Sequence, residues 1–243
     1  MVIAIETKGL TKEFKGKVAV DHLNLTIEQG ELFALLGLNG AGKTTTIRML
    51  CGLSRPTRGD ATLLTHSVIH EPYQVKAQIN VSPQETAIAP NLTVEENLIF
   101  IARVYNADPT TARAKAKEKI DLLKLNEYRS TKARTLSGGW QRRLSIAMAL
   151  ISEPKILFLD EPTLGLDVLA RRELWRVITD LKKSITILLT THYMEEAAAL
   201  SDRIGVMDNG KLIAIGTVAE LLRQTKTNNL EDAFVQLATT PST

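Results

Sequence analysis

A glycine-rich segment, Gly37–Thr44, has the residue types that bind phosphate, in the order Gly-Leu-Asn-Gly-Ala-Gly-Lys-Thr. It lies between an apolar run, Leu32–Leu36, and a helix-like stretch, Thr45–Leu50, which is the strand–loop–helix setting that a P-loop requires. The glycines would let backbone N–H groups approach a phosphate, and the N-terminus of the following helix adds donors and a favourable dipole. The segment therefore predicts a phosphate-binding loop; the alternative is a glycine-rich turn with an exposed lysine.

Two side chains of this loop could hold a nucleotide and its metal ion. The Lys43 ammonium would reach the β- and γ-phosphates, and the Thr44 hydroxyl would bind Mg²⁺. We therefore expect Mg-ATP as the ligand. The residues expected to line its phosphates are Asn39, Gly40, Ala41, Gly42, Lys43, Thr44 and Thr45.

Two acidic residues follow a second apolar run, Ile156–Leu159. Parallel α/β sheets bind ligands at the carboxyl ends of their strands, which is where Asp160 and Glu161 stand. Asp160 would hold Mg²⁺, and Glu161, on the other side of the extended chain, would act as general base on an attacking water. The alternative is an acidic strand end that caps a helix, which the following Pro162 and Thr163 would permit.

The elements that must position these residues follow from the hydrophobic pattern. The apolar runs that predict strands are Val2–Glu6, Leu23–Ile27, Leu32–Leu36, Ile156–Leu159, Ile185–Thr190 and Ile204–Met207. The middle runs are almost entirely apolar, as in strands buried on both faces of a parallel sheet. Short alternating strands in the N-terminal third predict an antiparallel β layer beside that sheet. Asp208-Asn209-Gly210 predicts a hairpin that leads into Lys211–Ile215.

Between about residues 92 and 152 the pattern becomes helical. Thr93 and Glu96 form a plausible capping box, and Pro109 begins an Ala/Lys/Arg/Glu-rich helix that runs to about Leu125. Further helices are expected at about Met194–Leu200 and Val218–Arg223, whereas the segment past residue 228 is weakly informative. The chain is therefore expected to be α/β with a helical insertion.

Composition limits the function classes. With 30 Lys and Arg against 27 Asp and Glu, the net charge of +3 does not favour nucleic acid as the main partner. The single cysteine, Cys51, excludes an intrachain disulfide and fits a reducing compartment. No N-terminal signal-like segment is seen, and no apolar run approaches the roughly 20 residues needed to span a bilayer. If the protein works at a membrane, another chain is expected to span it.

A second glycine-rich helix start, Leu136–Trp140, has the sequence Leu-Ser-Gly-Gly-Trp and lacks a lysine. Ser137 could cap the following helix, and Gly138 and Gly139 leave backbone amides open to an anion. With the P-loop and the two acids after Ile156–Leu159, it resembles the signature motif of the ABC-family ATPases. The resemblance covers about residues 3–220, with the family's motifs in order.

Other site residues follow from this resemblance, position by position. Phe14 is similar to the aromatic residue that stacks on adenine. Gln84, after Ser82-Pro83, matches the Q-loop glutamine, which contacts Mg²⁺ and water and senses the γ-phosphate. Asp167 ends a D-loop-like Leu-Gly-Leu-Asp at the dimer seam, and His192 matches the switch histidine that contacts the γ-phosphate. The resemblance thus implies Glu161, His192 and Gln84 as the residues of ATP hydrolysis.

The resemblance also implies an architecture, which is a RecA-like P-loop NTPase core with a parallel sheet, an antiparallel β subdomain and a helical insertion. One domain, 1–243, would contain this core at residues 1–91 and 153–220. Residues 92–152 would form the helical subdomain with the signature motif, and 221–243 a C-terminal tail.

The implied activity is ATP hydrolysis that powers transport. Two ATP molecules would be sandwiched in a head-to-tail dimer with a second copy or a homologous subunit. The chain would be cytoplasmic and peripheral on the inner face of the cell membrane, bound to transmembrane permease subunits. Four segments resemble the ATPase subunits of drug-resistance and polysaccharide-type exporters: Pro83–Glu85, Asn91–Leu98, Thr190–Ala197 and Leu230–Phe234. Export is therefore expected rather than import.

Two departures from the family pattern are Leu38, where a proline is common, and Trp140, where the signature usually has glutamine. The alternatives are a non-transport ABC ATPase of ribosomes or nucleic-acid machinery, a chromosome-maintenance ATPase, and a P-loop module that binds nucleotide without hydrolysis. ABC ATPases of ribosomes usually carry two cassettes in one chain with a charged linker. Chromosome-maintenance ATPases place long coiled coils between the P-loop and the signature. Neither feature is seen in this sequence. The pair Arg142-Arg143 is expected on the surface or interface of the signature helix, and Cys51 is expected to be packed. His22, His66 and His70 have no metal-ligand companions at useful spacing.

Overall fold

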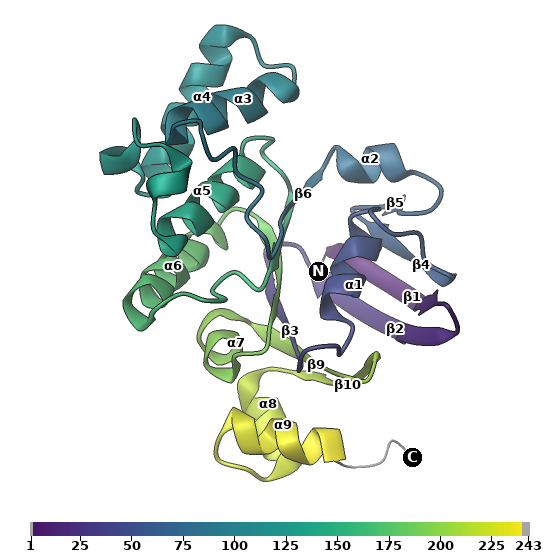
Figure 1. Cartoon of the computed structure of the whole chain (residues 1–243). Coiled ribbons are helices and arrows are strands. Elements are labelled where there is room, and N and C mark those ends of the chain that lie inside the picture. The colour runs from purple at the N-terminus through teal and green to yellow at the C-terminus, as the bar shows by residue number, and fades with distance from the viewer. Residues whose placement is uncertain (1, 240–243) are drawn as a thin grey trace.

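The computed structural model describes residues 2–239, which form two sheets and the helices around them (Figure 1). The strands are β1 (Ile3–Phe14), β2 (Lys17–Glu28), β3 (Leu32–Leu36), β4 (Arg58–Leu63), β5 (His66–Ser67), β6 (Ile79–Ser82), β7 (Ile156–Asp160), β8 (Thr186–Thr191), β9 (Arg203–Asp208) and β10 (Lys211–Gly216). The helices are α1 (Lys43–Leu50), α2 (Pro72–Lys76), α3 (Val94–Val104), α4 (Pro109–Leu122), α5 (Gly138–Leu150), α6 (Val168–Leu181), α7 (Met194–Leu200), α8 (Val218–Thr225) and α9 (Leu230–Thr239), with 3₁₀ turns at Asn126–Tyr128 and Ala133–Thr135.

The larger sheet has six strands in the order β10-β9-β3-β8-β7-β6. Strands β9, β3, β8, β7 and β6 are parallel, and β10 pairs antiparallel with β9 through the expected hairpin. A four-stranded antiparallel sheet, β2-β1-β4-β5, stands beside it. The α/β fold class expected from the sequence is confirmed, including the antiparallel layer.

Alternate residues of β3 face two different hydrophobic cores. Leu32, Ala34 and Leu36 pack against the helices, whereas Phe33 and Leu35 pack against α1 and the antiparallel sheet. Both faces of the strand are therefore buried, which explains why its sequence is apolar without alternation. Figure 1 shows the corresponding layers, with α3, α4 and α5 on one side of the parallel sheet and β1, β2 and β4 on the other.

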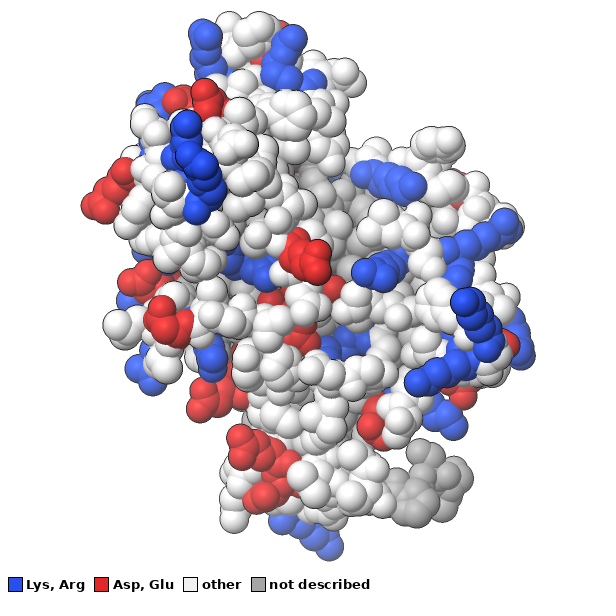
Figure 2. All heavy atoms as spheres, in the orientation of Figure 1, with Lys and Arg blue, Asp and Glu red and all other residues white. Residues whose placement is uncertain are grey.

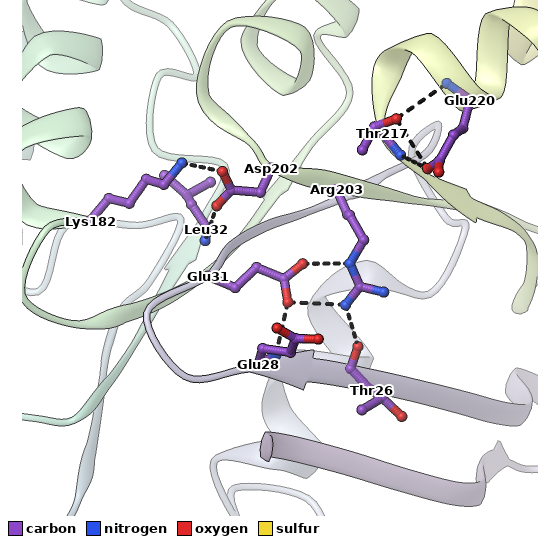
Figure 3. Close-up of polar contacts among 9 residues, drawn as sticks. All are labelled: Thr26, Glu28, Glu31, Leu32, Lys182, Asp202, Arg203, Thr217 and Glu220. Atoms are coloured by element: carbon purple, nitrogen blue, oxygen red, sulfur yellow. Dashed lines mark hydrogen bonds and ion pairs between the residues drawn. The ribbon is translucent and has the colours of Figure 1, made fainter. Parts of the chain in front are cut away.

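A polar cluster around the buried carboxylate of Glu31 joins the two sheets (Figure 3). Arg203 of β9 donates to both carboxylate oxygens of Glu31, at 2.8 and 3.0 Å, and to the Thr26 carbonyl of β2 at 2.7 Å. Asp202 accepts a hydrogen bond from the Leu32 backbone N–H at 2.9 Å and forms an ion pair with Lys182. The hydrogen bonds that Arg203 donates to Glu31 hold the pKa of Arg203 above its usual value. This cluster fixes the start of β3 to both layers.

The helical part differs in detail from the expectation. The capping box of Thr93 and Glu96 is present, with hydrogen bonds of 2.7 and 3.2 Å. The helix from Pro109 ends at Leu122 instead of about Leu125, and α7 has the expected bounds. Strands β4, β5 and β6 and helix α2 had not been anticipated.

The C-terminal segment is more ordered than a tail. Helices α8 and α9 pack on the core through Leu221, Leu230, Ala233 and Phe234. Residues 221–239 of the expected 221–243 tail are thus largely helical, and residues 240–243 lie outside the described part. The division into a core and a helical subdomain stays a prediction. Across residues 2–239, none of the helices has the length and apolar character required to cross a bilayer.

Candidate functional site

The P-loop follows β3 in a backbone path that needs glycine. Gly37 donates its N–H to the Thr191 carbonyl at 3.2 Å, and a Cβ on Gly37 would lie 2.4 Å from the Met207 carbonyl oxygen. Gly42 has φ of 104° and lies so close to the Ala19 carbonyl that a Cβ would stand 2.5 Å from it. Neither position has room for a larger residue, so the loop is held closely against its neighbours.

Lys43 begins α1, and its side chain is buried. The Lys43 Nζ donates to the carbonyls of Gly37 at 2.7 Å and Leu38 at 3.2 Å, inside the curve of the loop. It also lies 3.1 Å from Glu161 Oε1, and both side chains of this pair are about 6% exposed. The ammonium therefore lies against the backbone of the loop, where phosphate oxygens would contact it.

Asp160 collects two hydroxyl groups at the end of β7. Its Oδ1 accepts from Thr44 Oγ1 at 3.1 Å and from Thr190 Oγ1 at 2.6 Å. Hydroxyl and carboxylate oxygens are the hard ligands that Mg²⁺ prefers. The Thr44 and Asp160 oxygens are thus close enough together to fit one Mg²⁺, as the sequence predicts.

Glu161 is held in a strained backbone conformation. Its φ of 48° lies in the left-handed region, which costs a non-glycine residue on the order of 1–3 kcal/mol. The Glu161 N–H donates to the carbonyl and to the hydroxyl of Thr190, each at 3.1 Å. The chain is therefore not extended at Glu161, contrary to the expectation, because β7 ends at Asp160.

His192 completes this group from the end of β8. Its Nδ1 lies 2.8 Å from Glu161 Oε2. An ionised carboxylate has acceptors only, so the Nδ1–H of His192 is the donor when Glu161 is ionised. One carboxylate oxygen of Glu161 thus pairs with Lys43, and the other contacts His192.

A cavity of about 380 Å³ is lined by many of the residues that the sequence predicts for the ATP site. It lies where the carboxyl ends of β3, β6, β7 and β8 meet, as the rule for parallel sheets requires. The residues that line it are Ala19, Asn39, Gly40, Ala41, Gly42, Lys43, Thr44, Thr45, Gln84, Glu161, Leu164 and His192.

The remaining predicted residues lie outside this cavity. Phe14, at the β1–β2 turn, is 50% exposed, and the Lys12 ammonium stands 4.9 Å from its ring centre. Asp167 is exposed and caps α6, accepting from the N–H groups of Leu169 and Ala170 at 2.9 Å. Neither residue lines this cavity, and their roles in binding ATP stay predictions.

The signature segment presents its small residues to solvent. Ser137 takes the N-cap position of α5 without a side-chain hydrogen bond to the helix, and Ser137 and Gly138 are exposed while Gly139 is half-buried. Trp140 turns toward its own subunit, with its ring centre 4.5 Å from that of Tyr128 and 4.5 Å from the Arg143 guanidinium. The tryptophan that departs from the family pattern is therefore accommodated by packing beside the exposed serine and glycines.

Sequence reasoning misplaced the arginine pair and overlooked a buried acid. Arg142 and Arg143 are both 4% exposed, so they do not lie on the surface of α5 as expected. Glu196 of α7 is fully buried, and its Oε1 accepts from Trp175 Nε1 at 3.1 Å. Burial raises the pKa of Glu196, against the opposing effect of polar groups of Thr191, Thr163 and Trp175. Helical periodicity places Arg142 on the face of α5 that carries buried apolar residues, and this signal could have revealed it.

Residues 20–164 match the ABC transporter family. The chain is 45% identical over 90% of its length to the daunorubicin/doxorubicin resistance ATP-binding protein DrrA of Streptomyces peucetius. It is 41% identical over 96% to the probable multidrug ABC transporter ATP-binding protein YbhF of Escherichia coli. It is 40% identical over 91% to the Nod factor export ATP-binding protein I of Burkholderia lata. The aligned part of this chain covers 66%, 41% and 73% of the lengths of these three relatives, respectively.

Two solved structures share the fold over most of their length. An ATP-binding subunit of an ABC transporter superimposes with a TM-score of 0.84 at 29% identity, covering 96% of this chain and 99% of the other. The ATP-binding cassette MJ0796, described as dimeric in a post-hydrolysis state with ADP and Pi, has a TM-score of 0.79 at 25% identity and covers 88% and 98%.

Proposed function

Because the chain belongs to the ABC transporter family, we propose that it binds and hydrolyses Mg-ATP as the ATP-binding subunit of a membrane exporter. The observation that carries this proposal is the contact of Glu161 with both Lys43 and His192 in the cavity beside the P-loop. A phosphate-binding cation, a carboxylate base and a histidine are thus joined in one buried group. A module that only binds nucleotide would not need this carboxylate and histidine.

The chain's own groups divide the work of hydrolysis. Lys43 and the backbone N–H groups of the loop would bind the phosphates, and Mg²⁺ held by Thr44 and Asp160 would neutralise charge on the phosphate oxygens. When Lys43 turns to phosphate, Glu161 Oε1 loses its ion-pair partner and becomes free to accept a proton from water. His192 would hold the other carboxylate oxygen in place. Gln84, on the cavity wall, would contact the metal and water.

A second ATPase subunit would complete the site. Exposed apolar side chains surround the P-loop and the start of α6: Leu38, Leu164, Val168 and Leu169. Ser137 and Gly138 are also exposed, and they lie outside the cavity of their own chain. These features fit a head-to-tail pair in which the signature segment of one copy covers the phosphates held by the other. The dimeric MJ0796 relative supports this arrangement.

Permease subunits would dock on the helical side near Gln84. A cavity of about 240 Å³ there is lined by Pro83, Ala87, Ile101, Val104 and Tyr105, among others. The apolar Val104 and the aromatic Tyr105 are each more than half exposed. A cytoplasmic helix of a membrane subunit would cover them, which would place the chain on the inner face of the membrane. The face in Figure 2 carries charges of both signs, with Lys and Arg predominating on the right, over the antiparallel sheet.

The tests separate hydrolysis from transport. The purified chain should release phosphate from Mg-ATP, and Lys43→Ala should abolish both ATP binding and hydrolysis. A polytopic membrane protein should co-purify from detergent-solubilised membranes. Val104→Asp should lose that partner, whereas the same change at exposed Val235 on α9 should keep it. Co-sedimentation with ribosomes in place of a membrane partner would favour the non-transport alternative.

A further inference from the structure

The signature helix α5 carries a buried arginine that no step described so far uses. Arg142 is 4% exposed and lies in the first half of the helix that begins at the signature segment. Burying a guanidinium is costly unless its donors meet acceptors. Burial lowers the pKa of Arg142, and the carboxylates of Asp160 and Glu196 act in the opposite direction.

The acceptors that Arg142 meets belong to the loop that carries Gln84. One guanidinium nitrogen donates to the Pro83 carbonyl at 2.6 Å, and the other terminal nitrogen donates to the Gln84 carbonyl at 2.5 Å. A planar guanidinium can serve two adjacent carbonyls at once, which an ammonium cannot do with the same geometry. The backbone of this loop is therefore clamped on two consecutive residues.

A second contact between the same elements lies one turn further along α5. The hydroxyls of Ser145 and Ser82 are 3.0 Å apart and buried. The end of β6 and the loop after it thus contact α5 at two positions that lie one helical turn apart. Gln84 itself lines the phosphate cavity, and its backbone carbonyl accepts the hydrogen bond from Arg142.

We propose that Arg142 is a positioning residue for Gln84, which makes the signature segment and the Gln84 loop move as one unit. The proposal rests on the proposed ATPase function for its catalytic consequence. Helix α5 then connects Ser137, which would complete the ATP site of a partner, with Gln84, which belongs to the chain's own site. A displacement of the signature segment by the partner would be transmitted to Gln84 through the Arg142 guanidinium.

A double-mutant cycle tests whether Arg142 acts through Gln84. Arg142→Lys removes the fork of two hydrogen bonds and keeps the charge, and it should lower kcat about 10-fold with little change in KM. In a Gln84→Ala background the same change should have little further effect, because the residue that it positions is gone. A purely structural arginine would instead lower kcat by the same factor in both backgrounds, which would overturn the proposal. The matched control is Arg172→Lys on α6, where the arginine is exposed.

Hydrogen exchange gives a readout that does not need hydrolysis. In Arg142→Lys, amides of residues 84–89 should exchange about 10-fold faster, whereas those of α1 should be unchanged. Unchanged exchange at 84–89 would contradict the clamp. If Arg142→Lys does not fold, Arg142→Gln, which keeps one amide donor, serves in both experiments. If the unmodified chain does not hydrolyse ATP, the proposed function fails, and exchange alone decides whether the clamp exists.

Discussion

Lys43 and Glu161 form a buried ion pair across the phosphate cavity, with 3.1 Å between Nζ and Oε1. Both groups have a role in the proposed reaction, and neither can perform it fully while they are paired. Phosphate binding would draw the ammonium away and leave the carboxylate as a base. In the proposed reaction, nucleotide binding would therefore be coupled to activation of Glu161 through this contact.

Glu161→Gln should lower ATP hydrolysis by about 10²–10⁴-fold, because the amide cannot accept the proton. ATP binding should persist, since Lys43 and the loop are unchanged. Steady-state phosphate release and equilibrium binding of a fluorescent ATP analogue measure the two effects. Glu153→Gln, at an exposed glutamate, is the matched control. Hydrolysis at the wild-type rate in Glu161→Gln would refute the assignment of the base.

A chain with Asn39→Cys and Ser137→Cys should form an ATP-dependent disulfide between two copies. In a head-to-tail pair the P-loop of one copy faces the signature segment of the other, so an equal mixture of the two single variants should also cross-link. The natural Cys51 is buried and should contribute little background. Non-reducing gel electrophoresis, with the Glu161→Gln change to slow hydrolysis, gives the measurement. Equal cross-linking in each single variant alone would argue against this arrangement.

The sequence predicts the central parallel strands β3, β7 and β8 well because their burial is extreme. In β3 and β7 every residue is buried, so their apolar runs were unmistakable. Strand β6 is a short edge strand with two half-buried residues, and β4 begins with Arg-Gly-Asp, so neither has a clear strand pattern. The packed helix α9 was missed because its apolar residues lie on one face of a short segment.

The sequence predicts which residues gather at the site, but not which of them contact one another. Strand ends of a parallel sheet meet at one edge, which is why Lys43 and Asp160 are expected together, whereas His192 is expected from the family resemblance. The pairing of Lys43 with Glu161 depends on the strand order β3-β8-β7, which no local pattern contains. The left-handed φ of Glu161 and the inward turn of Trp140 likewise arise from tertiary packing.

Trp140→Gln should restore the residue usual in the signature and still destabilise the protein, by roughly 1–2 kcal/mol. The change removes the aromatic contact with Tyr128 and the cation–π contact with Arg143. Urea unfolding measures the free energy. Tyr73→Gln, at an exposed tyrosine, should have little effect. A Trp140→Gln protein as stable as wild type would mean that these contacts contribute nothing.

Glu196→Gln should change how stability depends on pH. Burial holds the pKa of Glu196 above its ordinary value of 4.5, so above pH 4.5 the folded state keeps a proton that the unfolded chain has lost. The free energy of unfolding from this group therefore falls as pH rises, by at most about 1.4 kcal/mol per pH unit, until the folded pKa is passed.

The glutamine variant should lose this slope and be relatively more stable at neutral pH. Urea unfolding at several pH values gives the comparison, with Glu195→Gln, at the exposed neighbour on α7, as control. Parallel pH profiles for wild type and Glu196→Gln would disprove the raised pKa.

Arg203→Met should destabilise the junction between the two sheets by about 1.5–3 kcal/mol. The change leaves the Glu31 carboxylate buried without its guanidinium partner (Figure 3). Arg58→Met removes an exposed arginine whose ion pair with Glu13 is 3.9 Å long, and it should cost far less. Equal losses in thermal unfolding would show that burial of Glu31 is not the cause.

The packing of β3 has a mechanical consequence. Because alternate side chains of this strand enter both cores, the loop at its end cannot shift without disturbing two layers. Gln84 and Ser137 instead belong to segments joined to α5, on one side of the sheet only. The P-loop end of β3 is thus held by both layers, whereas the signature segment and the loop that carries Gln84 are tied to α5 in one layer only.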